Sequence, residues 1–300
     1  MERTYMNFCN YLMTKKSTSA NTLSSYQRDL RQLMIYLQTK NITAWTDVSD
    51  EDLRQYFASL KKAKKSDATI SRSMSTMRCF FKYLVSKKIM PANPMAGIRG
   101  LKAEARLPEV LTSEEVELLL WQPDILTVKG IRDKAMLEVL YASGIRASEL
   151  LSLKLTDVNL DVGYLMMNHH EEKERIVPLY SLAVQALRNY LAESRPQLTK
   201  SAKENTLFLN TNGQPMTRQG FWKLVKYYTA AAKIEKDITP KTLRHSFAAH
   251  LLENGADINM VKDMMGHSSI TSTKVYAKLL KTKYLSTYEH CHPRAVKAGE

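Results

Sequence analysis

The helical spacing of apolar residues is interrupted about one third of the way along the chain, and this break most constrains how the sequence can fold. Thr112 and Glu115, just after the break, form a capping box that starts a new helix. A chain of 300 residues is long enough for two domains with separate cores. We therefore predict an N-terminal domain over 1–98, a linker over 99–110 and a second domain over 111–300. The break itself is made by Pro91, Pro94, Gly97 and Gly100.

Basic residues are concentrated before this break. Residues 1–102 contain 18 Lys and Arg against 7 Asp and Glu, whereas the remaining residues contain 26 against 23. An excess gathered in one part of the chain favours a polyanionic partner over a merely soluble, basic surface. The sequence has no long apolar run that would span a membrane, and its start lacks the apolar core of a secretory signal. We therefore expect nucleic acid, and not a membrane, as the partner.

The cysteine and histidine patterns argue against disulfides and metal sites. Cys9, Cys79 and Cys291 stand far apart with no paired spacing, which is typical of reduced thiols in a cytoplasmic protein. His169 and His170 are adjacent in a strand-like region, so their side chains point to opposite faces, a poor geometry for one metal ion. We expect no metal ion and no cofactor.

The first domain is predicted to be all-helical. Apolar residues recur at helical spacing in three segments. These are 19–40, a segment that begins at a cap on Ser49, and 68–88. Basic and hydroxyl side chains, Ser73 and Thr76 among them, are expected on the polar face of the third helix. We predict that this face and the neighbouring lysines contact DNA, although each residue taken alone fits a solvated helix face equally well. The predicted contacts are Lys61, Lys62, Lys64, Lys65, Arg72 and Arg78.

The second domain is predicted to combine helices with a small β-sheet, which makes the whole protein mainly α. Two strands joined by a turn are expected over 162–167 and 175–179, and a further short strand over 207–209. Arg218 lies at the start of a long helix predicted over 217–233 and is another candidate for DNA contact. The other expected helices cover 112–121, 129–141, 182–191 and 258–265, and one more begins at Arg146.

The stretch from Thr239 to Tyr276 carries the residues that most clearly suggest chemistry. Thr239 can cap a helix, and Arg244 and His245 fall near the N-terminal end of that helix, where an anion is favoured. His267 follows the next short helix, and Tyr276 comes nine positions later. Arginine binds phosphate oxygens, histidine donates protons and tyrosine is an oxygen nucleophile, so this set suits a phosphodiester.

These residues resemble the C-terminal signature of the tyrosine recombinases, H-x-x-R, then L-G-H, then a tyrosine nine residues later. Arg244, His267 and Tyr276 match it, whereas Lys241 stands where the family most often has the first histidine. The string ASGIRASELLSL around Arg146 resembles the first arginine box of the same family. The resemblance is nearest to XerC/XerD-like members and to transposon-borne integrases. It implies a helical, SAM-like core-binding domain followed by an α+β catalytic domain.

The resemblance also implies a mechanism. Tyr276 attacks the scissile phosphorus and leaves a 3′-phosphotyrosine link with a free 5′-hydroxyl. Arg146 and Arg244 bind the non-bridging oxygens, and His267 donates to the same phosphate. Lys241 supplies an electrostatic contact and a possible proton. Because the bond energy stays in the phosphotyrosine, the family needs neither ATP nor a metal ion.

Three further residues have assignments that the sequence leaves open. In the family, a lysine in the hairpin turn protonates the leaving 5′-oxygen. An ungapped alignment puts His170 at that position, and Lys173 is the next lysine downstream. Either residue is a candidate for the acid, and an exposed polar turn is the third possibility. Glu149, one turn after Arg146, either orients that arginine or forms an ordinary helix salt bridge.

The implied partner is double-stranded DNA with a specific recombination site. A homo-oligomer is expected, a tetramer on synapsed DNA, with or without a second recombinase. The implied role is chromosome dimer resolution or the integration and excision of a mobile element. Two alternatives are a type IB topoisomerase and a catalytically weak DNA-binding relative. A plain helix-turn-helix regulator would leave Tyr276, His267 and both arginines unexplained.

Overall fold

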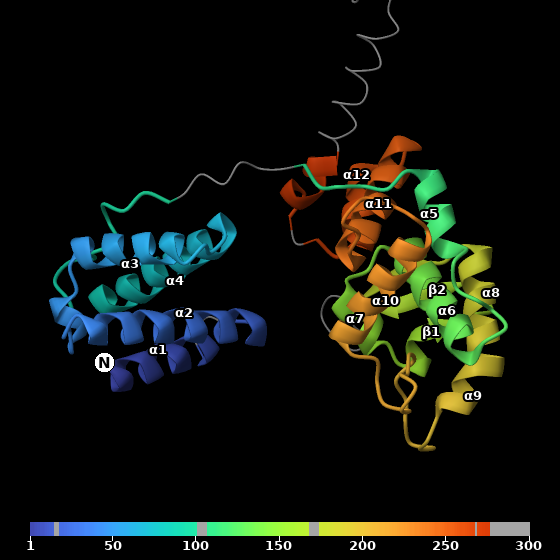
Figure 1. Ribbon diagram of the computed structural model, residues 1–300, viewed down its shortest axis with the longest axis horizontal. Helices are drawn as coiled ribbons and strands as arrows, with labels where there is room; N and C mark the ends of the chain where they lie inside the picture. The colour runs from blue at the N-terminus through green and yellow to red at the C-terminus, as the bar shows by residue number, and fades with distance from the viewer. Residues whose placement is uncertain (15–17, 101–106, 168–173, 268, 277–300) are drawn as a thin grey trace, which may run out of the picture. The chain divides into compact units, whose positions relative to one another are not determined.

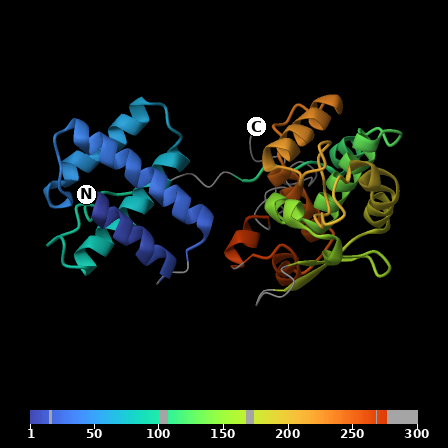
Figure 2. The same cartoon turned by 90° about the horizontal axis from the view of Figure 1, so that it is seen from below.

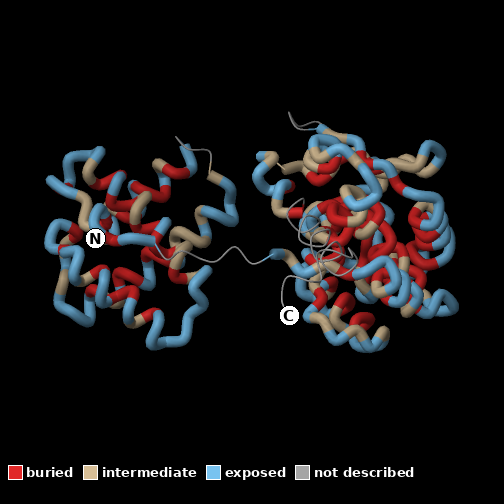
Figure 3. Tube along the Cα trace, turned by 90° about the horizontal axis from the view of Figure 1, so that it is seen from above, coloured by how far each residue is buried: buried red, intermediate tan, exposed pale blue. Residues whose placement is uncertain are grey.

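The structure of the protein is a computed structural model in which two compact units, Met1–Ala105 and Arg106–Glu300, each have their own hydrophobic core (Figure 3). Most of the chain is helical, and one small sheet lies in the second unit, which confirms the predicted fold class. No helix among the described residues is long and apolar enough to cross a membrane. The structure describes residues 1–14, 18–100, 107–167, 174–267 and 269–276.

The first unit is a bundle in which α2 contacts each of the other three helices (Figures 1 and 2). Ser49 and Asp52 form a capping box at the start of α3, and Ser66 accepts a hydrogen bond from Thr69 N–H at the start of α4. Three of the helices match the prediction, whereas α1 had not been distinguished as a separate helix. The helices are α1 (Glu2–Thr14), α2 (Ala20–Thr39), α3 (Asp50–Lys62) and α4 (Asp67–Ser86), with a 3₁₀ turn at Trp45–Asp47.

The second unit is built around α6, which is buried on nearly all sides and contacts both α8 and α11 (Figure 1). A helix enclosed in this way must pair its polar side chains. Arg132 binds Asp133 at 2.6 Å, and the Asp133 carboxylate also accepts from Tyr228 Oη at 3.0 Å. The helices of this unit are α5 (Ser113–Leu120), α6 (Val128–Ser143), α7 (Ala147–Ser152), α8 (Ser181–Asn189), α9 (Arg195–Leu198), α10 (Arg218–Ala231), α11 (Pro240–Glu253) and α12 (Ile258–Met264), with a 3₁₀ turn at Leu155–Asp157 and a π-helical turn at Tyr190–Ser194.

The sheet has three antiparallel strands in the order β1-β2-β3. The expected hairpin forms from β2 (Tyr164–Met167) and β3 (Arg175–Pro178), and β1 (Val158–Asn159) is a short strand that periodicity did not reveal. The strand predicted over 207–209 is wrong. Leu209 makes only an isolated bridge to Pro215, so this apolar segment is core without a ladder.

Gly144 ends α6 and fixes the chain direction into α7. Its φ of +57° is the left-handed conformation that favours glycine at a helix C-terminus. A Cβ there would lie 2.1 Å from Phe247 Cδ1 of α11, so no larger residue fits without displacing that ring. The short turn lets Arg146 open α7 directly beside α11, where Arg244 lies.

Candidate active site

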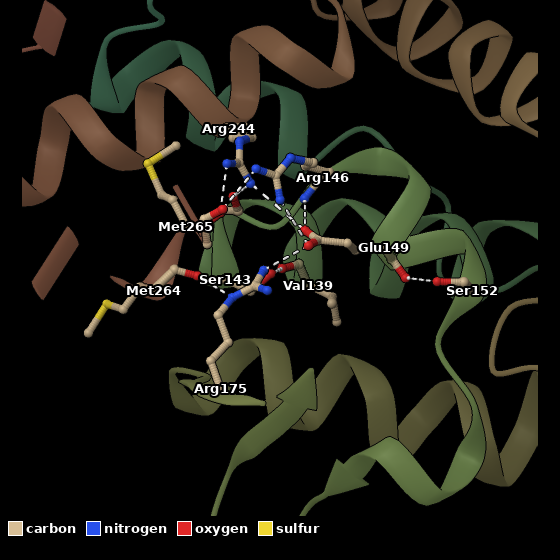
Figure 4. Close-up of polar contacts among 11 residues, drawn as sticks. Val139, Ser143, Arg146, Glu149, Ser152, Arg175, Arg244, Met264 and Met265 are labelled. Atoms are coloured by element: carbon tan, nitrogen blue, oxygen red, sulfur yellow. Dashed lines mark hydrogen bonds and ion pairs between the residues drawn. The ribbon is translucent and has the colours of Figure 1, made fainter. Parts of the chain in front are cut away.

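Three arginines from separate elements converge on the carboxylate of Glu149 in α7 (Figure 4). Glu149 Oε1 accepts from Arg146 Nη1 at 3.1 Å and from Arg175 Nη2 at 3.0 Å. Its Oε2 accepts from the backbone N–H of Arg146 at 2.7 Å and lies 4.0 Å from Arg244 Nη1. Glu149 therefore holds a cluster of positive charge together, which is more than an ordinary helix salt bridge.

The same three arginines bind successive backbone carbonyls at the end of α12. Arg175 Nε donates to Met264 O at 2.9 Å, and Arg244 Nη2 donates to Met265 O at 2.8 Å. Arg146 Nη2 donates to the next carbonyl, that of Gly266, at 2.9 Å. A helix C-terminus carries partial negative charge and unpaired carbonyls, so it is a natural place to fix guanidinium groups. The guanidiniums are thus held in place by backbone before any ligand arrives.

The electrostatics of this cluster follow from its burial. Burial alone would raise the pKa of the Glu149 carboxyl, but the hydrogen bond from the Arg146 backbone and the charges of Arg175 and Arg146 outweigh it and hold that pKa below its usual value. Burial, followed by the charge of Arg146, lowers the pKa of Arg244 to about 10. Glu149 and Arg244 are therefore charged near neutral pH. Three guanidinium groups around one carboxylate give the site a net positive charge that suits an anion.

His267 follows α12 and lines the same pocket as Arg146 and Arg244. Its Nδ1 is 2.9 Å from Oγ1 of Thr273, a fully buried residue, and its backbone N–H donates to Lys262 O. Burial and the neighbouring charges of Arg244 and Arg146 lower the pKa of His267 to about 4. The imidazole is therefore neutral near pH 7 and retains one N–H to donate.

Tyr276 lies on a helical segment, 271–276, and its side chain is almost completely buried, with 2 % of the residue exposed. Its hydroxyl lies 2.6 Å from Nδ1 of His245 on α11. Burial raises the pKa of the Tyr276 hydroxyl, and the charge of Arg244 opposes that rise. Burial and the charges of Lys241 and Arg244 lower the pKa of His245 to about 4, so this histidine too is neutral at pH 7.

One pocket of about 540 Å³ brings most of the predicted catalytic residues together. Lys241 is exposed in the first turn of α11, and Arg218, which had been predicted only as a DNA contact, lines the same pocket from α10. Lys241 and Arg244 are one turn apart on α11. The pocket is lined by Arg146, Ala147, Ser148, Arg218, Trp222, Thr239, Pro240, Lys241, Arg244, His245, His267 and Tyr276.

Two predicted site residues cannot be placed, and one residue of the site was not predicted. His170 and Lys173, the candidate acids, fall outside the described residues. Arg175 begins β3 and completes the arginine cluster, although sequence reasoning assigned it no role. The signal was present, since Arg175 stands in the string KER that follows the hairpin turn. Its importance lies in a contact with Glu149 that is 26 positions away, which no local pattern shows.

The predicted DNA contacts of the first unit fall into two groups. Lys61, Lys62, Lys64 and Lys65 are all exposed where α3 ends. Arg72 and Arg78 are instead half-buried, and their guanidinium groups bind other residues of the first unit. Arg72 Nη2 donates to Asp29 Oδ1 at 2.7 Å, and Arg78 Nη2 donates to Ile98 O at 2.8 Å. Two hydroxyl residues expected on the polar face, Ser73 and Thr76, are buried, and Thr76 Oγ1 donates to Asp29 Oδ2 at 2.9 Å.

Among the described residues, no group of three or more His, Cys, Asp or Glu is arranged to hold a metal ion. The pocket supplies several reactive groups from its own side chains. It offers fixed guanidiniums for phosphate oxygens, neutral imidazoles for proton transfer, and a tyrosine hydroxyl as nucleophile.

Comparison with known families matches nearly the whole chain. The model described as "Phage integrase family" matches residues 109–283, and the one described as "Phage integrase, N-terminal SAM-like domain" matches residues 6–88. A protein named "Tyrosine recombinase XerD" from Oceanobacillus iheyensis is 42% identical over 297 residues, which cover 98% of this chain and 100% of that relative. A protein of the same name from Listeria innocua is 41% identical and covers 96% of this chain and 98% of the relative.

Solved structures show the same fold. The XerH site-specific recombinase, bound to a palindromic difH substrate in a post-cleavage complex, gives a TM-score of 0.76 at 22% identity over 91% of this chain and 81% of that one. The Tn1549 transposon integrase, in complex with circular intermediate DNA, gives 0.72 at 21% identity over 91% and 94%. With family models along both units and full-length relatives at about 40% identity, the chain belongs to the phage integrase family and is a tyrosine recombinase, a site-specific enzyme that cuts and rejoins DNA strands.

Proposed function

We propose that Tyr276 is the nucleophile of this recombinase and attacks the scissile phosphorus of double-stranded DNA. The attack forms a 3′-phosphotyrosine and releases a 5′-hydroxyl, and the 5′-hydroxyl of a partner strand reverses the step on a new junction. Arg146 and Arg244 bind the non-bridging oxygens and stabilise the negative charge that grows in the transition state. His267 donates its N–H to the same phosphate.

The observation that supports these roles is the single pocket lined by Arg146, Arg244, His267 and Tyr276. The two arginines are already fixed by Glu149 and by the carbonyls that end α12, so they lose little freedom when a phosphate binds. A bound anion also offsets the electrostatic repulsion between the neighbouring guanidinium groups of Arg146 and Arg244. A site prepared in this way stabilises the negative charge of the transition state without having to reorganise.

The remaining roles concern proton transfer at the leaving 5′-oxygen. Lys241 is exposed at the pocket wall, and we assign it an electrostatic contact with the phosphate. Lys173 or His170 supplies the proton, with Lys173 preferred because its long side chain can reach into a DNA groove. A substrate with a 5′-phosphorothiolate needs no such proton, so it should rescue an alanine variant of the true acid. If neither variant slows cleavage of ordinary DNA, the acid is elsewhere.

We propose that the partner is a DNA duplex with a specific recombination site. XerH was solved bound to a palindromic difH substrate, and the Tn1549 integrase in complex with circular intermediate DNA. We propose that four copies assemble on two synapsed sites, with or without a second recombinase. Full-length similarity to proteins named XerD favours chromosome dimer resolution over the movement of a mobile element. Footprinting on genomic DNA around the gene would identify the site and test this choice.

The decisive experiment uses Tyr276→Phe on a nicked duplex that carries the footprinted site. Because only the hydroxyl is lost, the variant should bind this DNA with parental affinity and form no covalent complex on a denaturing gel. Tyr227→Phe is the matched control, since Tyr227 is exposed on α10 and lies outside the pocket. It should react like the parent. A covalent band with Tyr276→Phe would mean that the nucleophile is another residue.

The same assays separate recombination from the alternatives considered above. A type IB topoisomerase would relax supercoiled DNA of any sequence without pairing two sites. A binding-only relative would give a footprint and no covalent product. Strand exchange between two footprinted sites, and none between unrelated duplexes, is the result we expect.

A further inference from the structure

His245 makes a contact that the roles proposed above do not use. Its Nδ1 lies 2.6 Å from the hydroxyl oxygen of Tyr276, and the ring centroids of the two side chains are 5.4 Å apart. His245 lines the same pocket as Arg244, the preceding residue on α11. A short contact between an imidazole nitrogen and a nucleophile's oxygen is the arrangement in which a base activates a hydroxyl.

The state of the His245 imidazole suits this task. Burial and the positive charges of Lys241 and Arg244 keep its pKa near 4, so at neutral pH the ring carries one proton and one lone pair. If the proton is on Nε2, the lone pair on Nδ1 faces the tyrosine hydroxyl. A nearby phosphodiester adds negative charge and makes protonation of the ring easier at the moment of reaction.

The other pocket residues are less suited to accept this proton. Arg146 and Arg244 have donors only, and an ammonium group on Lys241 likewise has no acceptor. The Nδ1 of His267 is bound to Thr273. Among the described residues, no side chain other than His245 hydrogen-bonds the hydroxyl of Tyr276.

We propose that His245 is a catalytic general base, whose Nδ1 removes the hydroxyl proton of Tyr276 as the tyrosine oxygen bonds to phosphorus. The bond from phosphorus to the leaving 5′-oxygen breaks in the same step, and that oxygen takes a proton from the separate acid. Rejoining runs in reverse, and the imidazolium returns its proton to the tyrosine. This inference rests on the proposed role of Tyr276 as nucleophile.

The assignment also accounts for the lysine at position 241. Lys241 stands where the family most often has histidine, and it cannot act as a base while it carries its charge. His245 is one turn further along the same helix, so it faces the same side of α11. Lys241 can then attract the phosphate while His245 handles the proton of the nucleophile.

The first test compares His245→Asn with His250→Asn in single-turnover cleavage of the nicked duplex built on the footprinted site. Asparagine keeps a hydrogen-bonding group near the position of Nδ1 but cannot take the proton. His250 lies on the same helix, bound to Tyr141 Oη and Leu111 O and outside the pocket, so it controls for loss of a structural histidine. We expect the covalent complex to form about 100-fold or more slowly with His245→Asn. DNA affinity should be unchanged for both variants, and His250→Asn should cleave at the parental rate.

The pH dependence distinguishes a lost base from a distorted site. Without a base, the reaction needs tyrosinate formed by solvent, so the rate of His245→Asn should rise about tenfold per pH unit between pH 7 and 9. The parent should not show this rise. A 5′-phosphorothiolate should not rescue the variant, because that substrate relieves only the leaving group. Loss of less than about tenfold, a flat pH profile or rescue by the phosphorothiolate would each overturn the assignment.

A second measurement needs neither a variant that folds nor a DNA substrate. Nitrogen-15 NMR of the imidazole rings in the parent protein reports which nitrogen of His245 holds the proton. We expect the Nε2–H form, and the Nδ1–H form would overturn the proposal because Nδ1 would then have no lone pair. If Tyr276→Phe abolishes the covalent complex while His245→Asn retains it, only this inference fails. If Tyr276→Phe still reacts, the proposed nucleophile fails as well.

Discussion

The two units of this protein use positive charge in opposite ways. The first carries a large excess of basic residues, and its lysines at the end of α3 are exposed to solvent. The second is nearly balanced in charge, yet it draws three arginines together around Glu149. The comparison teaches that net charge predicts attraction to DNA, whereas chemistry depends on a few charges held in place.

The difference has a physical basis in solvent exposure. Exposed lysines are flexible and hydrated, and salt screens their charges over about 10 Å at 0.1 M. The guanidinium of Arg244 is buried and bound to Gly144 O at 2.7 Å and Met265 O at 2.8 Å. A fixed donor in a partly dry site does not have to reorganise during the reaction. We therefore expect the lysines of the first unit to affect mainly DNA affinity, and the arginines of the second to affect mainly the rate of cleavage.

The largest effect should come from removing the centre of the arginine cluster. Glu149→Ala leaves three guanidiniums without their shared carboxylate, so we expect a loss of about 3–5 kcal/mol in unfolding free energy. Cleavage should slow by on the order of 100-fold, because the arginines shift away from the phosphate. Chemical denaturation and single-turnover cleavage measure the two effects.

The matched control is Asp161→Ala in the same unit. Asp161 binds Arg188 at 3.3 Å, but its side chain is 94% exposed, so the pair should contribute no more than about 0.5 kcal/mol. Cleavage should not change. Equal losses for Glu149→Ala and Asp161→Ala would mean that burial does not distinguish the two kinds of charge pair.

A smaller effect, on binding alone, should follow from neutralising Lys61, Lys62, Lys64 and Lys65 together. The slope of log affinity against log salt should become shallower by about 0.9 for each phosphate that a lysine no longer neutralises, or by up to about 3.6 for the four. The rate of cleavage at saturating protein should stay the same. Replacement of Lys87 and Lys88, exposed lysines after α4, serves as the control. An unchanged slope in the fourfold variant would show that this surface does not face DNA.

Much of the fold was predictable because its signals are local. The capping box before α5, the threonine cap of α11 and the apolar spacing of most helices can all be recognised from neighbouring residues. The strand expected over 207–209 failed because a short apolar run fits buried irregular chain equally well. Helix α4 was predicted, but Thr76 faces inward because Asp29, on α2, accepts its hydrogen bond.

The site was predictable only in part for a related reason. Arg146, Arg244, His267 and Tyr276 belong to recognisable strings, so their proximity could be anticipated. The role of Arg175 depends on a contact between β3 and α7. That of His245 depends on how the segment 271–276 packs against α11. These contacts join positions far apart in the sequence, and no periodicity records them.

Acid should destabilise the second unit more than the first, which is a further contrast between the two units. His245 and His267 have folded-state pKa values of about 4, mainly through burial, against about 6.5 in an unfolded chain. Between these values the unfolded chain binds more protons, so stability is full above pH 6.5 and declines as the pH falls toward 4. The titratable groups that act on His245 are Lys241, Arg244 and His267. Those that act on His267 are Arg244, Arg146, Arg175 and Glu149.

All seven histidines lie after residue 168, so histidine protonation cannot make the stability of residues 1–105 depend on pH. Differential scanning calorimetry of the full chain should therefore show the transition of the second unit moving to lower temperature between pH 6.5 and 4.5, with that of the first unit moving less. Replacing both His245 and His267 with Asn should reduce the shift, since neither position can then take up a proton on unfolding. An equal shift in both transitions, or an undiminished one in the double variant, would show that the acid response has another source.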